Sequence, residues 1–320
     1  MRRPIPARWP AAALVALSAT LACGKRSGPL PLCLVETVEP GGSRELAPAL
    51  WFAHLLPDYA RDTARVRQPA RDCTGATSTW PTQGPCPLAT AAAPALPDRP
   101  LGPDDLILQP LGDDRALVWM ITTRFADGDG LGPAALVEWL PSGLAVRAVG
   151  PLRAPARGPA LRLEPLADTS VLVVDAERCA GTEDCRPVTV LVPLIDGRFH
   201  ATAVHGEGGR CDGPPEIDRA RGMQVTAGAS QRRFTLTAAL RFEAGRVTID
   251  EQVGVVDLDP RRPDDPPRTY RTVASSRQIA LVDGTLHDDR PPLWPRVLAQ
   301  EARVDADAPA SAPPITVKKP

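Results

Sequence analysis

The sequence predicts a mainly β protein: an antiparallel β-sandwich or barrel-like domain with a short N-terminal helix and a loop-rich section. Between about residues 106 and 287, short apolar or alternating segments are separated by Gly, Pro and Asp-Gly turns. No long amphipathic helix separates these segments, which disfavours parallel βαβ units. A small β-propeller is the alternative, but the segments follow no fixed period.

The composition fits a globular protein of this size. The chain has 320 residues, of which 43% are hydrophobic, enough to bury a sizeable core. It also has 25 Gly and 38 Pro, well above ordinary usage, which favours a loop-rich fold. The formal net charge is −1, whereas a general nucleic-acid binder needs a basic excess. We therefore expect no nucleic-acid partner.

The N-terminus predicts export. Arg2, Arg3 and Arg8 precede an apolar run at 11–22 that is too short to span a bilayer, so residues 1–22 are expected to be a signal peptide. The segment Thr20-Leu21-Ala22-Cys23-Gly24 resembles the lipobox of bacterial lipoproteins, although Thr20 stands where the usual lipobox has Leu.

That resemblance covers residues 1–24 only, and the mature domain resembles no family that we recognise. It implies cleavage before Cys23 and acylation of this residue by fatty acids such as palmitate, which would anchor the protein firmly to a membrane. Gly24 stands where an Asp would mark retention at the inner membrane, so the implied address is the cell envelope at the outer membrane, with the domain in the periplasm or at the surface. The rival interpretation is an ordinary secretory signal in which Cys23 is incidental.

The remaining cysteines predict disulfide bonds. An even number in an exported protein indicates a disulfide framework, and six cysteines allow fifteen connectivities. Two pairs of neighbours bracket polar loops, Cys73 with Cys86 and Cys179 with Cys185, and each pair could close a local bridge. A zinc site is disfavoured because the chain has no C-x-x-C spacing. The six residues are Cys33, Cys73, Cys86, Cys179, Cys185 and Cys211.

Two sections precede the β domain. Residues 23–45 are expected to form a lipid-anchored tether, to which Cys33 can add a fixed point. Residues 46–105 are expected to form a helix and a Cys/Pro-rich loop section packed on the main domain. The helix is predicted over 46–56, with Pro48 near its start, and it is apolar nearly all round. That favours burial against the domain over a position on the membrane surface, because the segment lacks a basic face.

The antiparallel β domain is expected over 106–303. Residues 304–320 are rich in Ala, Pro, Asp and Ser and are expected to form a disordered tail. The predicted strands are 106–110, 115–124, 134–140, 143–149, 160–166, 169–176, 187–194, 197–204, 232–243, 246–257 and 276–283.

The clearest element is a hairpin from Arg232 to Asp257 with its turn at Ala244-Gly245. A register that pairs Phe242 with Val247 places the apolar residues of both strands on one face. The same register places Glu251 on that inward face, opposite Ala238. A buried carboxylate must be paired, hydrogen-bonded or protonated. Glu251 is thus a candidate ligand or general base, with a bulge or an ion pair with an Arg as the structural alternatives.

A second acidic motif lies upstream. Asp127, Asp129, Gly132 and Glu138 occupy positions 1, 3, 6 and 12 of a calcium-binding loop. Leu131 occupies position 5, where an oxygen ligand is needed, and the flanks read as strands. The motif is therefore interpreted as an acidic hairpin loop, with a calcium site of another type through Asp127 and Asp129 as the alternative.

No residue pattern predicts a metal or another cofactor. His200 and His205 are five residues apart, which puts them on opposite faces of a strand. His54 and His287 are interpreted as packed or solvent-facing residues. We find no G-x-S-x-G, S-x-x-K or nucleotide-binding glycine motif.

The sequence therefore favours a non-catalytic binding or assembly module of the envelope, anchored by Cys23, with a possible envelope protein as partner. The Pro-rich loop 261–268 is the best candidate for a protein-binding loop. The alternative is an envelope hydrolase or carbohydrate-active enzyme on a β scaffold that uses carboxylates such as Glu251 or Asp250.

Overall fold

The computed structural model of the chain describes residues 30–36, 46–81, 86–88, 93–181, 184–227, 230–243, 245–259, 266–306 and 316–318. The chain divides into Met1–Leu30 and Pro31–Pro320, and the fold described below is that of the second unit. The expected signal peptide, Cys23 and most of the loop 261–268 lie outside the described residues.

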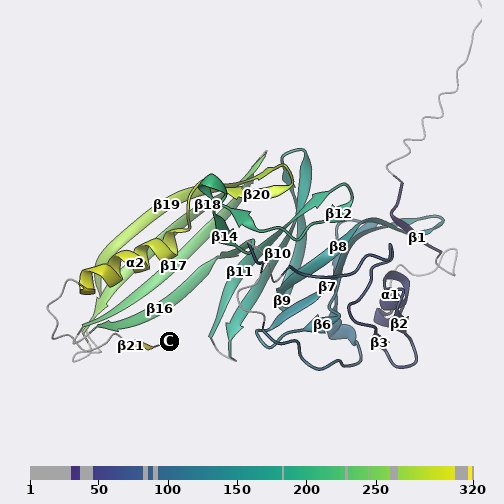
Figure 1. The fold of residues 1–320 in the computed structure, drawn as a ribbon, viewed down its shortest axis with the longest axis horizontal. Helices are drawn as coiled ribbons and strands as arrows, with labels where there is room; N and C mark the ends of the chain where they lie inside the picture. The colour runs from purple at the N-terminus through teal and green to yellow at the C-terminus, as the bar shows by residue number, and fades with distance from the viewer. Residues whose placement is uncertain are drawn as a thin grey trace, which may run out of the picture. The chain divides into compact units, whose positions relative to one another are not determined.

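The fold is mainly β, as predicted, and consists of two large sheets (Figure 1). The first sheet is nearly closed like a barrel, because β4 and β9, at the two ends of its strand order, lie in contact. Its order is β4 (Leu106–Pro110), β5 (Arg115–Met120), β7 (Asp129–Leu140), β8 (Gly143–Pro155), β12 (Arg198–Phe199), β11 (Asp184–Ile195), β10 (Thr169–Ala180) and β9 (Arg157–Leu166).

Three short strands pair with this barrel outside the main path. They are β1 (Cys33–Val35) on β8, β6 (Thr123–Arg124) on β7, and β15 (Glu216–Asp218) on β11. A separate small hairpin joins β2 (Tyr59–Ala60) to β3 (Arg65–Val66). Short 3₁₀ turns span Pro103–Asp105 and Glu207–Gly209.

The second sheet forms a half-barrel. Its order is β14 (Cys211–Gly213), β13 (Val204–His205), β20 (Thr285–Asp288), β19 (Arg268–Val282), β18 (Arg246–Leu258), β17 (Ser230–Glu243), β16 (Ala220–Ala227) and β21 (Thr316–Lys318). Its pairs are antiparallel except for β13–β20, which is parallel, as is β12–β8 in the barrel.

The barrel is buried on both faces over β5, β7 and β8. Alternate residues of β5 and the residue after it, Leu117, Trp119 and Ile121, enter the barrel interior. The intervening residues face outward and are covered by helix α1 (Pro48–Leu55), which lies within the predicted range and starts with Pro48 at its first position. Trp51 and Phe52 of α1 are completely buried there, so the helix packs on the domain as expected.

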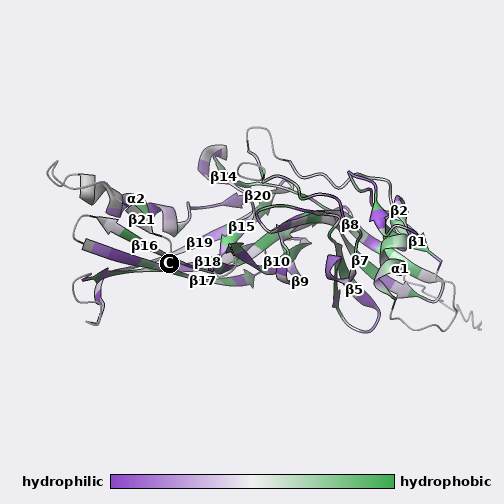
Figure 2. Ribbon diagram, turned by 90° about the horizontal axis from the view of Figure 1, so that it is seen from below, coloured by the Kyte–Doolittle hydropathy of each residue, from purple (hydrophilic) through white to green (hydrophobic). Residues whose placement is uncertain are grey.

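One face of the half-barrel is shared between the barrel and a second helix. Near β10, Val247 and Ile249 pack against Val171 and Val173 of the barrel. Farther along the same strands, helix α2 (Leu293–Ala306) covers the apolar residues of β17 and β18. In Figure 2, strands of this sheet show alternating hydrophobic and hydrophilic segments.

The predicted hairpin is β17–β18, and its register is confirmed. Phe242 pairs with Val247, and Glu243 pairs with Arg246. The sequence did not predict β14, β16, β20, β21 or helix α2. In β16 the residues are mostly polar or small, and α2 follows Pro291-Pro292 and has Pro295 in its first turn.

The disulfide framework is confirmed, with bridges Cys33–Cys73, Cys86–Cys211 and Cys179–Cys185. Cys179 and Cys185 form the local bridge that their spacing allowed. Cys73 and Cys86 do not pair with each other, because each lies near a cysteine from a distant segment. Cys33 belongs to β1, so a strand lies within the segment expected to be a tether.

The C-terminal segment also differs from the expected tail over 304–320. Helix α2 extends to Ala306, and β21 pairs with β16. Residues 307–315 lie outside the described residues. The main-chain pairing of β21 adds a strand to an open sheet edge, which composition alone could not indicate.

Candidate functional site

A polar cavity of about 430 Å³ lies where loops and strands of the barrel meet β14 and β15. Trp80 and Leu88 form part of its wall, and the Trp80 indole N–H donates to the Leu88 carbonyl oxygen at 3.3 Å. Most of the remaining lining is ionic. The charged residues are Asp127, Asp129, Arg153, Arg178, Arg186, Asp212, Glu216 and Asp218.

The first part of this lining is built around Arg153 of β8. Its guanidinium group donates to Asp129 at 2.9 Å and to Asp127 at 3.0 Å. It also lies 4.0 Å from the centroid of the Phe125 ring, a cation–π contact. The Arg153 side chain is only 4% exposed, so the two carboxylates compensate a charge that would otherwise be costly to bury.

Asp127 and Asp129 are positioned by the turn between β6 and β7. Gly128 adopts a φ of +86°, a conformation that glycine accepts without strain. The Asp127 carboxylate accepts a hydrogen bond from the Asp129 backbone N–H at 3.1 Å, which fixes the turn. Both side chains thus lie at the end of β7 that faces the cavity.

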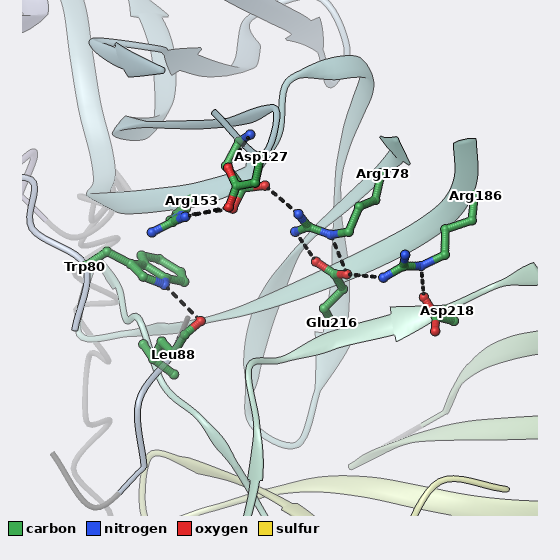
Figure 3. Close-up of polar contacts among 9 residues, drawn as sticks. Trp80, Leu88, Asp127, Arg153, Arg178, Arg186, Glu216 and Asp218 are labelled. Atoms are coloured by element: carbon green, nitrogen blue, oxygen red, sulfur yellow. Dashed lines mark hydrogen bonds and ion pairs between the residues drawn. The ribbon is translucent and has the colours of Figure 1, made fainter. Parts of the chain in front are cut away.

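Arg178 of β10 continues the network. It lies 2.9 Å from the second oxygen of Asp129 and donates through its Nε to Glu216 at 2.7 Å (Figure 3). Burial by itself would lower the pKa of Arg178, but the hydrogen bond and the negative charges of Glu216 and Asp129 raise this pKa above its usual range. Arg178 is therefore a permanent cation that links the Asp129 turn to β15.

Glu216 compensates two like charges in the β10–β11 ladder. Arg178 and Arg186 lie directly opposite each other in the register, an arrangement of like charges that destabilises a sheet. Glu216 contacts both arginines: it pairs with Arg178, and one of its oxygens lies 3.7 Å from Arg186. Arg186 also pairs with Asp218. β15 thus supplies the carboxylates that hold the two arginines.

The result is a continuous network in which guanidinium groups and carboxylates alternate from Asp127 to Asp218 (Figure 3). Outside the lining, Arg210 pairs with Asp212 and Arg221 pairs with Asp218. With these partners the positive and negative charges balance. The cavity wall therefore offers hydrogen-bond donors and acceptors in alternation, which suits a polar ligand without a large net charge.

The calcium alternative is not supported by this geometry. The carboxylates of Asp127 and Asp129 are directed at Arg153 and Arg178, and Glu138 lies near the other end of β7, paired with Arg147. In the described part of the chain, one group of three side chains could hold a metal ion, Glu177 with Cys179 and Cys185. The two cysteines form a disulfide, so this group has no thiolate to offer.

Glu251 lies on the inward face opposite Ala238, where the sequence placed it, and it is only 4% exposed. One carboxylate oxygen lies 3.3 Å from Arg277, and the other accepts a hydrogen bond from the backbone N–H of Leu293 at 3.0 Å. Arg277 also pairs with Asp288, whose pKa is raised by burial in spite of the arginine.

Glu251 therefore fixes the start of α2 and neutralises a buried arginine. Asp250 points to the opposite face and pairs with Arg241 at 2.8 Å. The side chains of the two carboxylates named for a hydrolase therefore lie on opposite faces of β18, although both residues border one open pocket.

Sequence reasoning found Asp127 and Asp129 but not the arginines or β15 residues that join them. The residues of the network are spread over 91 positions, from Asp127 to Asp218, and no local spacing links them. The one available signal was the position of Arg178 and Arg186 beside the bridging cysteines 179 and 185.

Among the described residues, no helix combines the length and the apolar character needed to cross a membrane. No protein-family model, curated protein or solved structure matches this chain.

Proposed function

We propose that this protein is a lipoprotein of the cell envelope, anchored at the outer membrane by acylated Cys23, and that it acts as a non-catalytic binding module. The N-terminal motif supports the anchor, and the three disulfides fit a protein that folds in an oxidising compartment. We further propose that the cavity lined by Arg153, Arg178 and Glu216 binds a polar segment of an envelope protein.

One observation carries the choice of site. The lining of the cavity is a network of ion pairs whose members come from β7, β8, β10, β11 and β15 and from the β6–β7 turn, and its charges balance when Arg210 and Arg221, outside the lining, are included. Such a network is preorganised, since its side chains are already held by one another before a ligand arrives. A peptide segment offers amide N–H and C=O groups that match alternating acceptors and donors.

The network supports binding rather than hydrolysis for a chemical reason. A general acid or base needs a carboxylate free to exchange a proton with the substrate. Here Asp129 and Glu216 each accept from guanidinium groups that stabilise their ionised forms. Their oxygens are therefore suited to hold hydrogen-bond donors in place.

The experiment blocks the cavity without touching the network. Ala93 lines the cavity and takes part in none of its ion pairs, so Ala93→Trp should fill the cavity while the charges remain paired. Ala239→Trp, on an exposed position of β17, is the matched control. Tagged proteins are captured from intact envelopes after crosslinking, alongside the wild type.

We expect one partner to be recovered with the wild type and with Ala239→Trp, and to fall at least about tenfold with Ala93→Trp. Equal recovery with both variants would overturn the proposed site. Metabolic labelling with an alkyne fatty acid tests the anchor separately: label on the wild type and none on Cys23→Ala is expected, and label on both would overturn the acylation of Cys23.

A further inference from the structure

Two histidines that are 82 positions apart in the sequence lie side by side in the half-barrel. His205 of β13 and His287 of β20 are direct partners in the parallel ladder. Their ring centroids are 5.9 Å apart, and the ring planes are inclined at 34°. From these observations we propose that His205 and His287 form a binding site for a divalent first-row transition ion such as Zn²⁺ or Cu²⁺.

The strand alternation directs both imidazoles to the same side. The preceding residues, Val204 and Leu286, are also paired and are both buried in the core between the two sheets. Because successive side chains of a strand point to opposite faces, His205 and His287 project away from that core. Both rings are half-buried, so an ion and its water ligands can reach them.

The separation of the rings fits a shared ion. A coordinated imidazole nitrogen lies about 2.0–2.1 Å from Zn²⁺, so the centroids of two imidazoles on one ion are roughly 5–6 Å apart. The observed 5.9 Å lies within that range. Histidine nitrogens suit zinc and copper, whereas magnesium and calcium prefer oxygen ligands.

The imidazole nitrogens are also available. Among the described residues, neither ring takes part in a hydrogen bond or an ion pair, and the contact between the two rings is the interaction that the structure gives them. The carboxylates of the adjoining residues are already engaged: Asp288, next to His287, pairs with Arg277, and Asp212, next to Cys211, pairs with Arg210. The site therefore offers two imidazole nitrogen ligands, and water completes the coordination.

The strands that carry the rings are held in place. On its other side β13 pairs with β14, where His205 is the partner of Cys211, and Cys211 is bonded to Cys86. The ligands thus need little rearrangement to meet an ion, which favours binding. Sequence analysis considered His205 only beside His200 and disfavoured that pair, because it could not show that β13 and β20 are neighbours.

The test is a calorimetric titration of the full-length protein in detergent, purified without a histidine tag, with ZnCl₂ and separately with CuCl₂. The variants are His205→Gln and His287→Gln, with His200→Gln as the matched control from the same region. Urea unfolding of each variant, read by circular dichroism, establishes that it is folded.

We expect one ion per chain, at least about tenfold weaker binding in either site variant, and unchanged binding in His200→Gln. With Cu²⁺, the visible absorption band of nitrogen ligation should disappear in the two site variants. Absence of saturable binding by the wild type, or binding that survives both site substitutions in folded protein, would overturn the proposal. This outcome is independent of the partner captured through the cavity.

Discussion

Replacement of Glu251 by Gln tests whether this buried carboxylate stabilises the fold. Glu251 faces Arg277 at 3.3 Å and accepts from the Leu293 backbone at 3.0 Å, and both charged side chains are about 95% buried. A glutamine keeps the shape and can still accept from Leu293, but it removes the charge that compensates Arg277. Asp288 remains as the arginine's other partner.

The expected loss in the free energy of unfolding follows from those contacts. Breaking a buried ion pair costs about 3–5 kcal/mol, and because Asp288 still compensates Arg277, Glu251→Gln should cost about 2 kcal/mol. Glu251→Ala also removes the acceptor at the start of α2 and leaves a cavity, so its cost should rise to about 3–5 kcal/mol. The next residue provides the control, since Asp250 forms an exposed pair with Arg241.

Urea unfolding followed by circular dichroism measures these values, with an unchanged slope indicating an unchanged unfolded state. Asp250→Asn should lie within about 0.5–1 kcal/mol of the wild type, as is usual for exposed pairs. The reasoning is refuted if Glu251→Gln is as stable as the wild type, or if Asp250→Asn is destabilised to the same extent.

Three further predictions concern other parts of the fold. Removing the Cys86–Cys211 bridge by double Ser substitution should lower the free energy of unfolding by about 5 kcal/mol, because this bridge closes a loop of 125 residues. Removing the local Cys179–Cys185 bridge should lower it by about 2 kcal/mol, and equal losses would contradict this. Arg178→Met should destabilise the protein by about 3–5 kcal/mol in urea unfolding, since it removes the cation shared by Asp129 and Glu216 and leaves Glu216 with the more distant Arg186; a neutral effect would show that the network contributes little. Burial, with the charge of Arg61, lowers the pKa of His54, so the unfolded state protonates this imidazole more readily than the folded state does. The stability that His54 contributes should be present above about pH 6.5 and should decline as the pH falls through the lowered pKa. The variant His54→Gln should not show that decline.

Local patterns were sufficient to predict much of the β architecture. The alternation from Phe234 to Phe242 fixed the β17–β18 register and placed Glu251 inside, because a shift by one residue would have turned every apolar side chain to solvent. Pro48 near the start and Pro57 just beyond the end also bounded α1 locally, because proline is tolerated in the first turn of a helix but cannot continue one. The mainly β class followed from many such segments.

The remaining features depend on contacts between distant segments. Closure of the barrel requires β4 to approach β9, and the bonding of Cys86 to Cys211 requires two loops to meet. The cavity network likewise depends on β15 crossing to β11, where Glu216 lies between two opposed arginines. Neither spacing nor periodicity encodes such encounters, so sequence reasoning identified Asp127 and Asp129 without their partners.

The central claim is that an anchored protein binds an envelope partner through the cavity. The most direct measurement places a small diazirine-bearing residue at Ala93, and in a matched protein at Ala239, and irradiates intact cells. Our account predicts a discrete adduct from position 93 only, and a marked loss of that adduct when Cys23→Ala releases the protein from the membrane. The same adducts from both positions, or an adduct from position 93 that is insensitive to the loss of Cys23, would contradict it.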